Sequence, residues 1–247
     1  MRYFITFTYR GTEFHGSQTQ PNGNTVQAEM EKAFATILRI PVALTFAGRT
    51  DAGVHAEQMV AHFDMAKTLP ANFAARLNNL LPSAIAVRDI RPVKDEAHAR
   101  FDAKERTYYY RITTRKDPFL VFTHTRVADG LDFEAMNRAA KRLVGKQDFA
   151  SFCRTHTDVK TTICDVREAK WVQETGTEAY FVITADRFLR NMVRAVVGTL
   201  FEVGRGKMSV EKFAGVIASH DRCQAGHSAP AEGLSLVEIK YSNNIYL

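Results

Sequence analysis

The order of hydrophobic patterns along the chain constrains the fold more than any other feature. Apolar and polar residues alternate over residues 3–9, and this pattern predicts a strand with one buried face. Segments with this alternation and segments with the helical spacing of apolar residues then follow one another along the chain. The predicted elements are a strand over 3–9, a helix over 26–38, strands over 42–47 and 57–63, a helix over 71–80 and a strand over 85–90. This β-α-β-β-α-β order is typical of a ferredoxin-like sheet with both helices on one face.

The second half of the chain repeats this order without repeating the sequence. Its predicted elements are a strand over 106–113, a helix over 133–144, a hairpin over 166–173 and 179–185, helices over 188–203 and 209–219 and a strand over 234–241. We therefore predict an α+β fold of two tandem ferredoxin-like halves, residues 1–100 and 101–247. The halves are expected to form a mixed or antiparallel sheet. Residues 116–130 and 154–162 are expected to be polar loops.

Composition excludes several classes of protein. Hydrophobic residues make up 45% of the 247 residues, which is enough to fill sizeable cores. The 33 Lys and Arg exceed the 27 Asp and Glu by six charges, a balance that permits a polyanionic partner without requiring one. The three cysteines form no C-x-x-C pair or zinc-ligand cluster, and no apolar run approaches the ~20 residues of a membrane-spanning helix. We expect a folded, cytoplasmic protein that has no metal site and no membrane segment.

One nine-residue stretch, 48–56, carries more chemistry than a turn needs. It places a single carboxylate, Asp51, between two predicted strands, with glycines near it in the turn. Aspartate often caps its own turn, and taken alone this structural role explains Asp51. The guanidinium of Arg49, two residues earlier, could however hold the carboxylate ionised and oriented. Residue 53 is Gly, which excludes a D-x-D phosphotransferase. Asp51 is therefore a candidate nucleophile or base.

Three arginines fall within one arc of the helix predicted over 188–203. They are Arg187, Arg190 and Arg194. An ordinary solvated basic face would explain them. The use of arginine without lysine favours recognition of phosphate or carboxylate groups, because a guanidinium binds such groups through two parallel hydrogen bonds.

Three consecutive tyrosines lie on the strand predicted over 106–113. Tyr108 and Tyr110 share one face of that strand, and Tyr109 lies on the other. Packing within the sheet is the usual role of such residues. An aromatic ring on a sheet that meets nucleic acid can also stack on an exposed base, and the spacing does not choose between these roles.

A set of motifs extends through nearly the whole chain. They are Gly48-Arg49-Thr50-Asp51-Ala52-Gly53-Val54-His55-Ala56, Tyr9-x-Gly11-Thr12-x-Phe14-x-Gly16-x-Gln18, His98-Ala99-Arg100-Phe101, Arg106-x-Tyr108, Met192-Val193-Arg194-x-x-Val197-Gly198 and Ala231-Glu232-Gly233-Leu234. Together they resemble the TruA family of tRNA pseudouridine synthases. The resemblance implies two ferredoxin-like halves around a deep basic cleft, a homodimer, and no metal or organic cofactor. It also implies isomerisation of uridines 38–40 in the anticodon stem-loop of tRNA.

The resemblance assigns roles to four residues. Asp51 corresponds to the catalytic aspartate and Tyr108 to the tyrosine that stacks on the target base. Arg194 corresponds to an arginine that pairs with the catalytic carboxylate, and Arg49 to one that extrudes the target nucleotide. Asp51 is therefore expected to face the seam between the halves, within reach of Tyr108 and Arg194.

The implied reaction and two departures from the family pattern leave alternatives open. An ionised carboxylate can attack C1′ of the ribose, attack C6 of the uracil or act as a base. The family often has Asp and Trp where this chain has Arg10 and Ser17. Both residues are expected near the cleft wall of the first half, where they would affect the RNA contacts.

Two other functions compete with the synthase. A non-catalytic RNA-binding protein with two RRM-like sheets would carry aromatic RNP-type strands, and the sequence has none. A small-ligand-binding ferredoxin-like dimer would have no salt-dependent affinity for tRNA.

Overall fold

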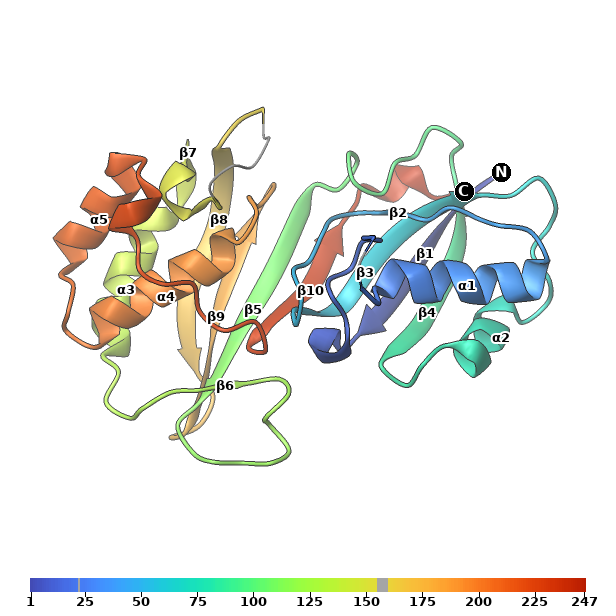
Figure 1. Ribbon diagram of the computed structural model, residues 1–247. Helices are drawn as coiled ribbons and strands as arrows, with labels where there is room; N and C mark the ends of the chain where they lie inside the picture. Colours follow the sequence, from blue (N-terminus) through green and yellow to red (C-terminus); the bar gives the residue numbers. More distant parts are fainter. Residues whose placement is uncertain (22, 155–159) are drawn as a thin grey trace. The chain divides into compact units, whose positions relative to one another are not determined.

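The computed structural model describes residues 1–21, 23–154 and 160–247 (Figure 1). Its helices are α1 (Val26–Leu38), α2 (Phe73–Leu80), α3 (Phe133–Ala140), α4 (Met192–Gly204) and α5 (Val210–Ser219). Its strands are β1 (Arg2–Tyr9), β2 (Thr45–Phe46), β3 (His55–Asp64), β4 (Ile85–Val93), β5 (Glu105–Thr113), β6 (Thr125–Arg126), β7 (Gly145–Asp148), β8 (Ile163–Gln173), β9 (Glu178–Ala185) and β10 (Leu234–Lys240). Short 3-10 helices cover Gly11–Glu13, Lys141–Leu143, Ala150–Phe152, Arg222–Gln224 and Asn243–Ile245. The predicted α+β class is confirmed.

The packing of the chain divides it into two compact units. Unit 1 comprises Met1–Glu105 and Ser235–Leu247, and unit 2 comprises Arg106–Leu234. The predicted division at residue 100 assigns the last strand to the second half, whereas most of this strand belongs to unit 1. Strand β10 pairs in parallel with β3 of unit 1, through Ser235 opposite His55. Hydrogen bonding of the backbone therefore attaches the C-terminal residues to the first unit.

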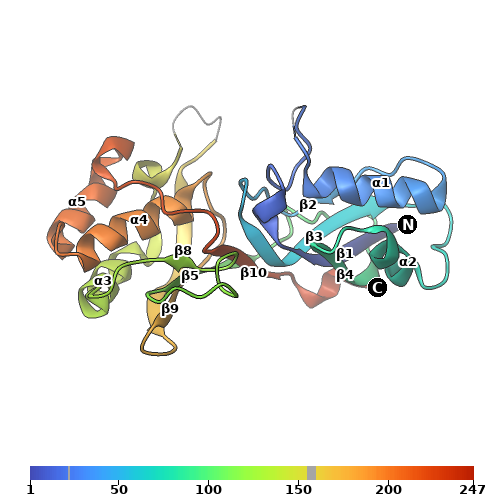
Figure 2. The same ribbon diagram turned by 60° about the horizontal axis from the view of Figure 1, so that its bottom comes forward.

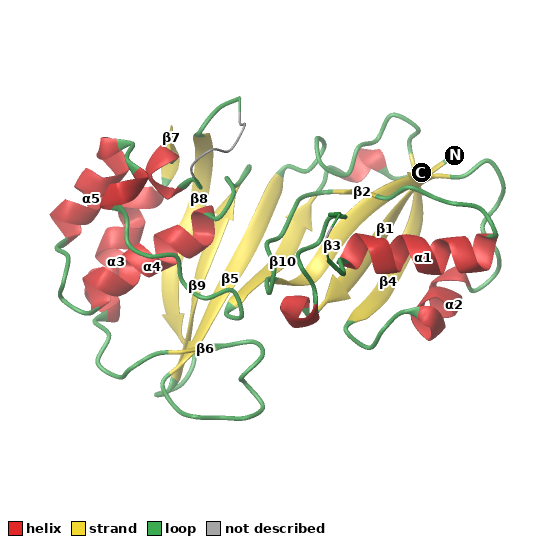
Figure 3. Cartoon of the chain, in the orientation of Figure 1, coloured by secondary structure: helices red, strands yellow, loops and turns green. Residues whose placement is uncertain are grey.

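Unit 1 has the strand order of a ferredoxin-like sheet. The order is β4-β1-β3, and β2 and β10 both pair with β3. Strand β1 is antiparallel to both of its neighbours, with Ile5 opposite Ala61 of β3 and Ile90 of β4. Figures 1 and 3 show α1 and α2 over this sheet. The predicted order of the first half is confirmed, although the predicted strand over 42–47 is reduced to two residues.

Phe34 of α1 joins the layers of unit 1. Its ring packs edge-on against Phe63 of β3, with centroids 5.0 Å apart, and against Phe73 of α2, at 5.1 Å. Phe34 is fully buried, and Val26 and Met30 are buried on the same side of the helix. Burial of a side chain of this size stabilises the fold by about 1.5–3 kcal/mol, which fixes α1 on the sheet.

Unit 2 is an antiparallel sheet covered by three helices. The strand order is β5-β9-β8-β7, and the short β6 adds in parallel to β5. Figure 2 shows α3, α4 and α5 gathered on one side of β5, β8 and β9. Trp171 of β8 lies at the centre of the core, with its ring centroid 5.4 Å from that of Phe181 in β9 and 5.8 Å from that of Phe201 in α4. The sheet and the central helix therefore share one core.

The helix predicted from residue 188 begins later than expected. Asn191 precedes α4 with φ of 65°, in the left-handed region that breaks a right-handed helix and that asparagine tolerates better than most residues. Only Arg194 of the three arginines therefore lies on α4. All residues of this helix are buried except Arg194 and Glu202, which are partly exposed. The alternative explanation of the three arginines, an ordinary solvated basic face on one helix, therefore does not apply.

The loop prediction over 116–130 needs a correction as well. The segment contains β6, and it exposes large apolar side chains, with Phe119 90% exposed. Apolar surface therefore accompanies the expected polar residues. The loop predicted over 154–162 includes residues 155–159, which lie outside the described residues. None of the helices in the described ranges is long and apolar enough to cross a membrane.

Candidate active site

The loop between β2 and β3 holds Asp51 in a defined turn. The amide of Val54 donates to the carbonyl oxygen of Asp51 at 3.1 Å, and Gly53 takes a φ of 80°. A positive φ at the third position of a turn favours glycine. Gly48 has no positive φ, and open space surrounds the position of a Cβ there. The backbone conformation therefore favours glycine at position 53 and does not require it at position 48.

The N-terminal segment that follows β1 packs directly beneath this loop. Gly11 lies so close to it that a Cβ on Gly11 would be 2.0 Å from the carbonyl oxygen of Val54. The Gly11 amide donates to Nδ1 of the buried His55 at 2.9 Å. The motif Tyr9–Gln18 thus supports the Asp51 loop.

Thr50, which directly precedes Asp51, is held through all of its polar groups. Its amide donates to Ser17 Oγ at 2.9 Å, and its carbonyl oxygen accepts from the Ser17 amide at 3.2 Å. Its hydroxyl shares a 2.7 Å hydrogen bond with the hydroxyl of Tyr9. Tyr9, Ser17 and Thr50 are all buried, so these hydrogen bonds do not compete with water.

Asp51 itself is partly exposed, whereas Arg49 is exposed. Thr50 is anchored inward, and the Arg49 side chain next to it lies in solvent. The expected role of Arg49 in holding the Asp51 carboxylate stays a prediction. The loop therefore presents a carboxylate on a fixed backbone, which suits a nucleophile or a base.

The two departures from the family pattern occupy different environments. Arg10 is exposed and pairs with Glu13 at 2.6 Å. Ser17 is fully buried beneath the Asp51 loop. The side chain of Ser17 faces Thr50, and its expected effect on the RNA contacts stays a prediction.

In unit 2, Tyr108 lies on β5 beside the segment that precedes α4. Its ring meets that of Phe188 edge-on, with centroids 5.0 Å apart. Tyr108 is partly exposed, whereas Tyr110 on the same face is fully buried. Tyr109 on the opposite face stacks on Tyr180 at 4.6 Å. The structure therefore separates the three tyrosines: Tyr110 is a core residue, and Tyr108 can offer part of its ring to a ligand.

Arg194, on the first turn of α4, is held by the segment 226–231, which we call the strap. Its Nε donates to the carbonyl oxygen of Ala229 at 2.7 Å. The Tyr110 hydroxyl donates to Pro230 O at 3.0 Å and shares a 2.7 Å hydrogen bond with Thr125. Burial raises the pKa of Tyr110 well above its usual value, so it remains a neutral hydrogen-bond donor to the strap.

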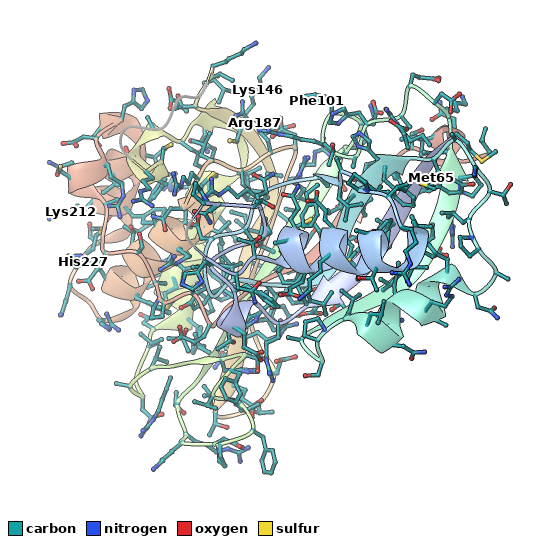
Figure 4. The ribbon with its side chains drawn as sticks, turned by 45° about the vertical axis from the view of Figure 1, so that its right-hand side comes forward. Met65, Phe101, Lys146, Arg187, Lys212 and His227 are labelled. Atoms are coloured by element: carbon teal, nitrogen blue, oxygen red, sulfur yellow. The ribbon has the colours of Figure 1, made fainter. Side chains whose placement is uncertain are left out.

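Arg187 and Arg190 precede α4 and are partly exposed (Figure 4 labels Arg187). The Arg187 amide donates to the carboxylate of Asp186, and the Arg190 carbonyl oxygen accepts from the Arg154 amide. Within the described part of the chain, no group of three or more His, Cys, Asp or Glu side chains is placed to hold a metal ion.

Sequence reasoning missed the residues that support the site. They are Tyr9, Ser17 and the strap residue Ala229. Tyr9 and Gly11 belong to one of the motifs, so a signal for their importance existed. The contact between Ser17 and Thr50 spans 33 residues of sequence and leaves no local pattern.

Comparison with known proteins gives a consistent result over nearly the whole chain. The family model for tRNA pseudouridine synthase matches residues 5–102 and 139–242. A protein of Bacteroides thetaiotaomicron named tRNA pseudouridine synthase A is 53% identical over 99% of this chain and 92% of its own length. Proteins of the same name from Parabacteroides distasonis and Bacillus licheniformis are 52% and 42% identical, over 99% and 98% of this chain and 98% and 100% of their own lengths.

Proposed function

The chain belongs to the family of tRNA pseudouridine synthases, and on that premise we propose that it isomerises uridine 38, 39 or 40 of tRNA with Asp51 as the essential catalytic group. Members of this family are isomerases that convert uridine to pseudouridine. The observation that carries the assignment of Asp51 is its setting. The carboxylate of Asp51 is partly exposed, and the preceding residue, Thr50, is held through its amide, its carbonyl oxygen and its hydroxyl. The carbonyl oxygen of Asp51 accepts the hydrogen bond that closes the turn.

The reaction rearranges bonds without adding or removing atoms. The bond from ribose C1′ to uracil N1 breaks, the base turns, and a bond from C1′ to C5 forms. The proton on C5 leaves, and N1 gains a proton. Asp51 can act as a nucleophile at C1′, as a nucleophile at C6, or as the base that accepts the C5 proton. All three roles require a carboxylate at a fixed position, and the anchoring of Thr50 and the turn from Asp51 to Val54 support them.

Other residues act on the extruded nucleotide. A uridine inside a stem-loop must leave its stack before a side chain can reach C1′, and an aromatic ring can hold the base while it turns. We assign this role to Tyr108, whose ring is partly exposed and backed by Phe188. Arg49, exposed at the tip of the Asp51 loop, assists extrusion.

Arginines of unit 2 supply positive charge. The Nε of Arg194 is used by the strap, and within the described ranges its two terminal nitrogens make no hydrogen bond, so they are available to a carboxylate such as that of Asp51. Arg187 and Arg190 contact phosphates of the RNA. The net charge of +6 favours binding of the tRNA backbone. The proposal includes a homodimer that works in the cytoplasm.

The experiment that tests this function maps pseudouridine in unmodified tRNA transcripts incubated with purified protein. The expected result is pseudouridine at position 38, 39 or 40 and at no other position. Binding of tRNA without any isomerised uridine would instead support the non-catalytic RNA-binding protein. Pseudouridine outside the anticodon stem-loop would keep the chemistry and reject the proposed positions.

A further inference from the structure

Ser17 links the beginning of α1 to the Asp51 loop. Its carbonyl oxygen accepts from the amide of Gln27, in the first turn of α1, at 2.9 Å. Its amide and its Oγ make the two hydrogen bonds to Thr50, at 3.2 and 2.9 Å. All three polar groups of Ser17 are therefore used, and none of them reaches solvent because the residue is fully buried.

The two hydrogen bonds between Ser17 and Thr50 fix the backbone before Asp51. The Ser17 amide holds the peptide group that joins Thr50 to Asp51, and Ser17 Oγ holds the preceding peptide group through the Thr50 amide. The turn from Asp51 to Val54 fixes the backbone immediately after it. The orientation of the Asp51 side chain follows from the position of these two peptide groups, because a side chain of two rotatable bonds starts from a fixed Cα–Cβ vector. Loss of Ser17 Oγ would leave the buried Thr50 amide without its acceptor and weaken one side of this frame, which would then be held by the Ser17 amide alone.

We propose that Ser17 is a positioning residue for catalysis: its Oγ, by accepting from Thr50, holds the Asp51 carboxylate in line with the reacting nucleotide. The inference rests on the proposed role of Asp51. Ser17 does not touch the RNA, so the departure from the family pattern at this position affects the rate of the chemical step and leaves RNA binding unchanged.

The test uses two substitutions that separate hydrogen bonding from volume. Ser17→Ala removes the acceptor and leaves a small void. Ser17→Cys keeps nearly the same volume and offers only a weak sulfur acceptor. Ser151 provides a matched control, because it is also fully buried and its hydroxyl donates to the Val216 carbonyl oxygen in unit 2. Ser151→Ala removes a comparable buried hydrogen bond in unit 2, far in sequence from Ser17 and Asp51.

Three quantities are measured for each variant of the full chain: the single-turnover rate constant of tritium release from tRNA carrying [5-³H]uridine, the Kd for tRNA, and the melting temperature. For both Ser17 variants we expect the rate constant to fall ~10- to 100-fold, the loss typical of a misplaced reacting group, with Kd within about threefold of the wild-type value. Ser151→Ala is expected to lower the melting temperature and to leave the rate constant unchanged.

Two results would overturn the inference. One is a wild-type rate constant for Ser17→Cys, which would show that only volume matters at this position. The other is an equal effect of Ser17→Ala and Ser151→Ala on the rate constant, which would show a general loss of stability. Asp51→Asn, measured in parallel, separates this failure from that of the proposed function. If Asp51→Asn is inactive while Ser17→Ala is fully active, the positioning role alone is rejected. If Asp51→Asn is active, the assignment of Asp51 is rejected as well.

Discussion

Arg194 and Ala229 are joined by two hydrogen bonds that run in opposite directions. The Ala229 amide donates to the Arg194 carbonyl oxygen at 2.9 Å, and Arg194 Nε donates to the Ala229 carbonyl oxygen at 2.7 Å. Gly198, one turn further along α4, permits the approach of the strap, because a Cβ there would lie 1.7 Å from the His227 carbonyl oxygen. The guanidinium is therefore held through its Nε, and in the part of the chain that the structure describes its two terminal nitrogens make no hydrogen bond.

Arg194→Lys tests this arrangement. Lysine keeps the charge but has no Nε–H donor and no planar fork, so both the anchor to Ala229 and the paired donors are lost. A hydrogen bond to a charged group contributes about 1.5–3 kcal/mol, so the single-turnover rate constant is expected to fall ~10- to 150-fold. Arg205→Lys, at the exposed end of α4, serves as the control and should leave the rate unchanged. Wild-type activity of Arg194→Lys would show that a point charge is sufficient.

Gly11→Ala tests the contact beneath the Asp51 loop. The added Cβ would lie 2.0 Å from the Val54 carbonyl oxygen, so either the loop or the N-terminal segment must move. The expected loss in the free energy of unfolding is about 1–3 kcal/mol, as for other overpacked sites, together with reduced activity. Denaturant unfolding measures the first effect. Gly48→Ala in the same loop meets no atom within 4 Å and should change neither quantity. An unaffected Gly11→Ala would contradict the close approach.

Tyr108→Phe and Tyr108→Ala separate the ring from the hydroxyl. If the ring is the platform for the base, phenylalanine should retain most of the activity. Alanine should lower kcat/KM for tRNA ~5- to 150-fold, because stacking of a base on an aromatic ring contributes about 1–3 kcal/mol. Tyr109→Ala removes the same ring from the opposite face of β5 and serves as the control. Equal losses for Tyr108→Ala and Tyr109→Ala would point to damage to the sheet instead of lost stacking.

His62 gives unit 1 a dependence on pH. Burial, together with the charges of Arg2 and His98, lowers the pKa of His62 to about 4, and its Nδ1 accepts from the Ala99 amide at 3.2 Å. The unfolded state, with a pKa near 6.5, then binds more protons than the folded state between about pH 6.5 and pH 4. Stability from this residue is complete above about pH 6.5 and is lost as the pH falls to about 4.

The expected contribution of His62 is ~3 kcal/mol, from about 1.4 kcal/mol for each pH unit of the shift. Denaturant unfolding at several pH values measures it. His62→Asn keeps an oxygen acceptor for the Ala99 amide and removes the titration, so the variant should lose less stability than the wild type between pH 6.5 and pH 4. Identical losses in the two proteins would refute the role of His62.

The sequence patterns predicted most of the secondary structure, because the periods of strands and helices follow from which side chains are buried. They failed at α4, where apolar spacing continued through Phe188 and Leu189 although Asn191 adopts a left-handed conformation. Hydrophobic spacing reports burial, and residues before a helix can be buried too. Leu189 is 5% exposed without being helical.

The candidate site was predicted less completely than the fold. Asp51 could be identified because a tight turn needs glycines but does not need the Arg-Thr-Asp sequence between them. Tyr108 could be identified as one of three tyrosines on a strand. The role of Ser17 was not predictable, because a serine in a loop is ordinary and only the packing of two distant segments buries it against Thr50. Local patterns therefore indicate which residues carry chemistry, and long-range contacts decide how they are held.

The most direct test concerns Asp51. Asp51→Asn keeps the size of the side chain and the backbone turn, but removes the ionised carboxylate. In a single-turnover assay of tritium release from tRNA carrying [5-³H]uridine, with Kd for tRNA measured separately, we expect no detectable release and an unchanged Kd. Asp129→Asn, on an exposed loop of unit 2, is the control and should match the wild type. Substantial release by Asp51→Asn would contradict the assignment of Asp51 as the essential catalytic group.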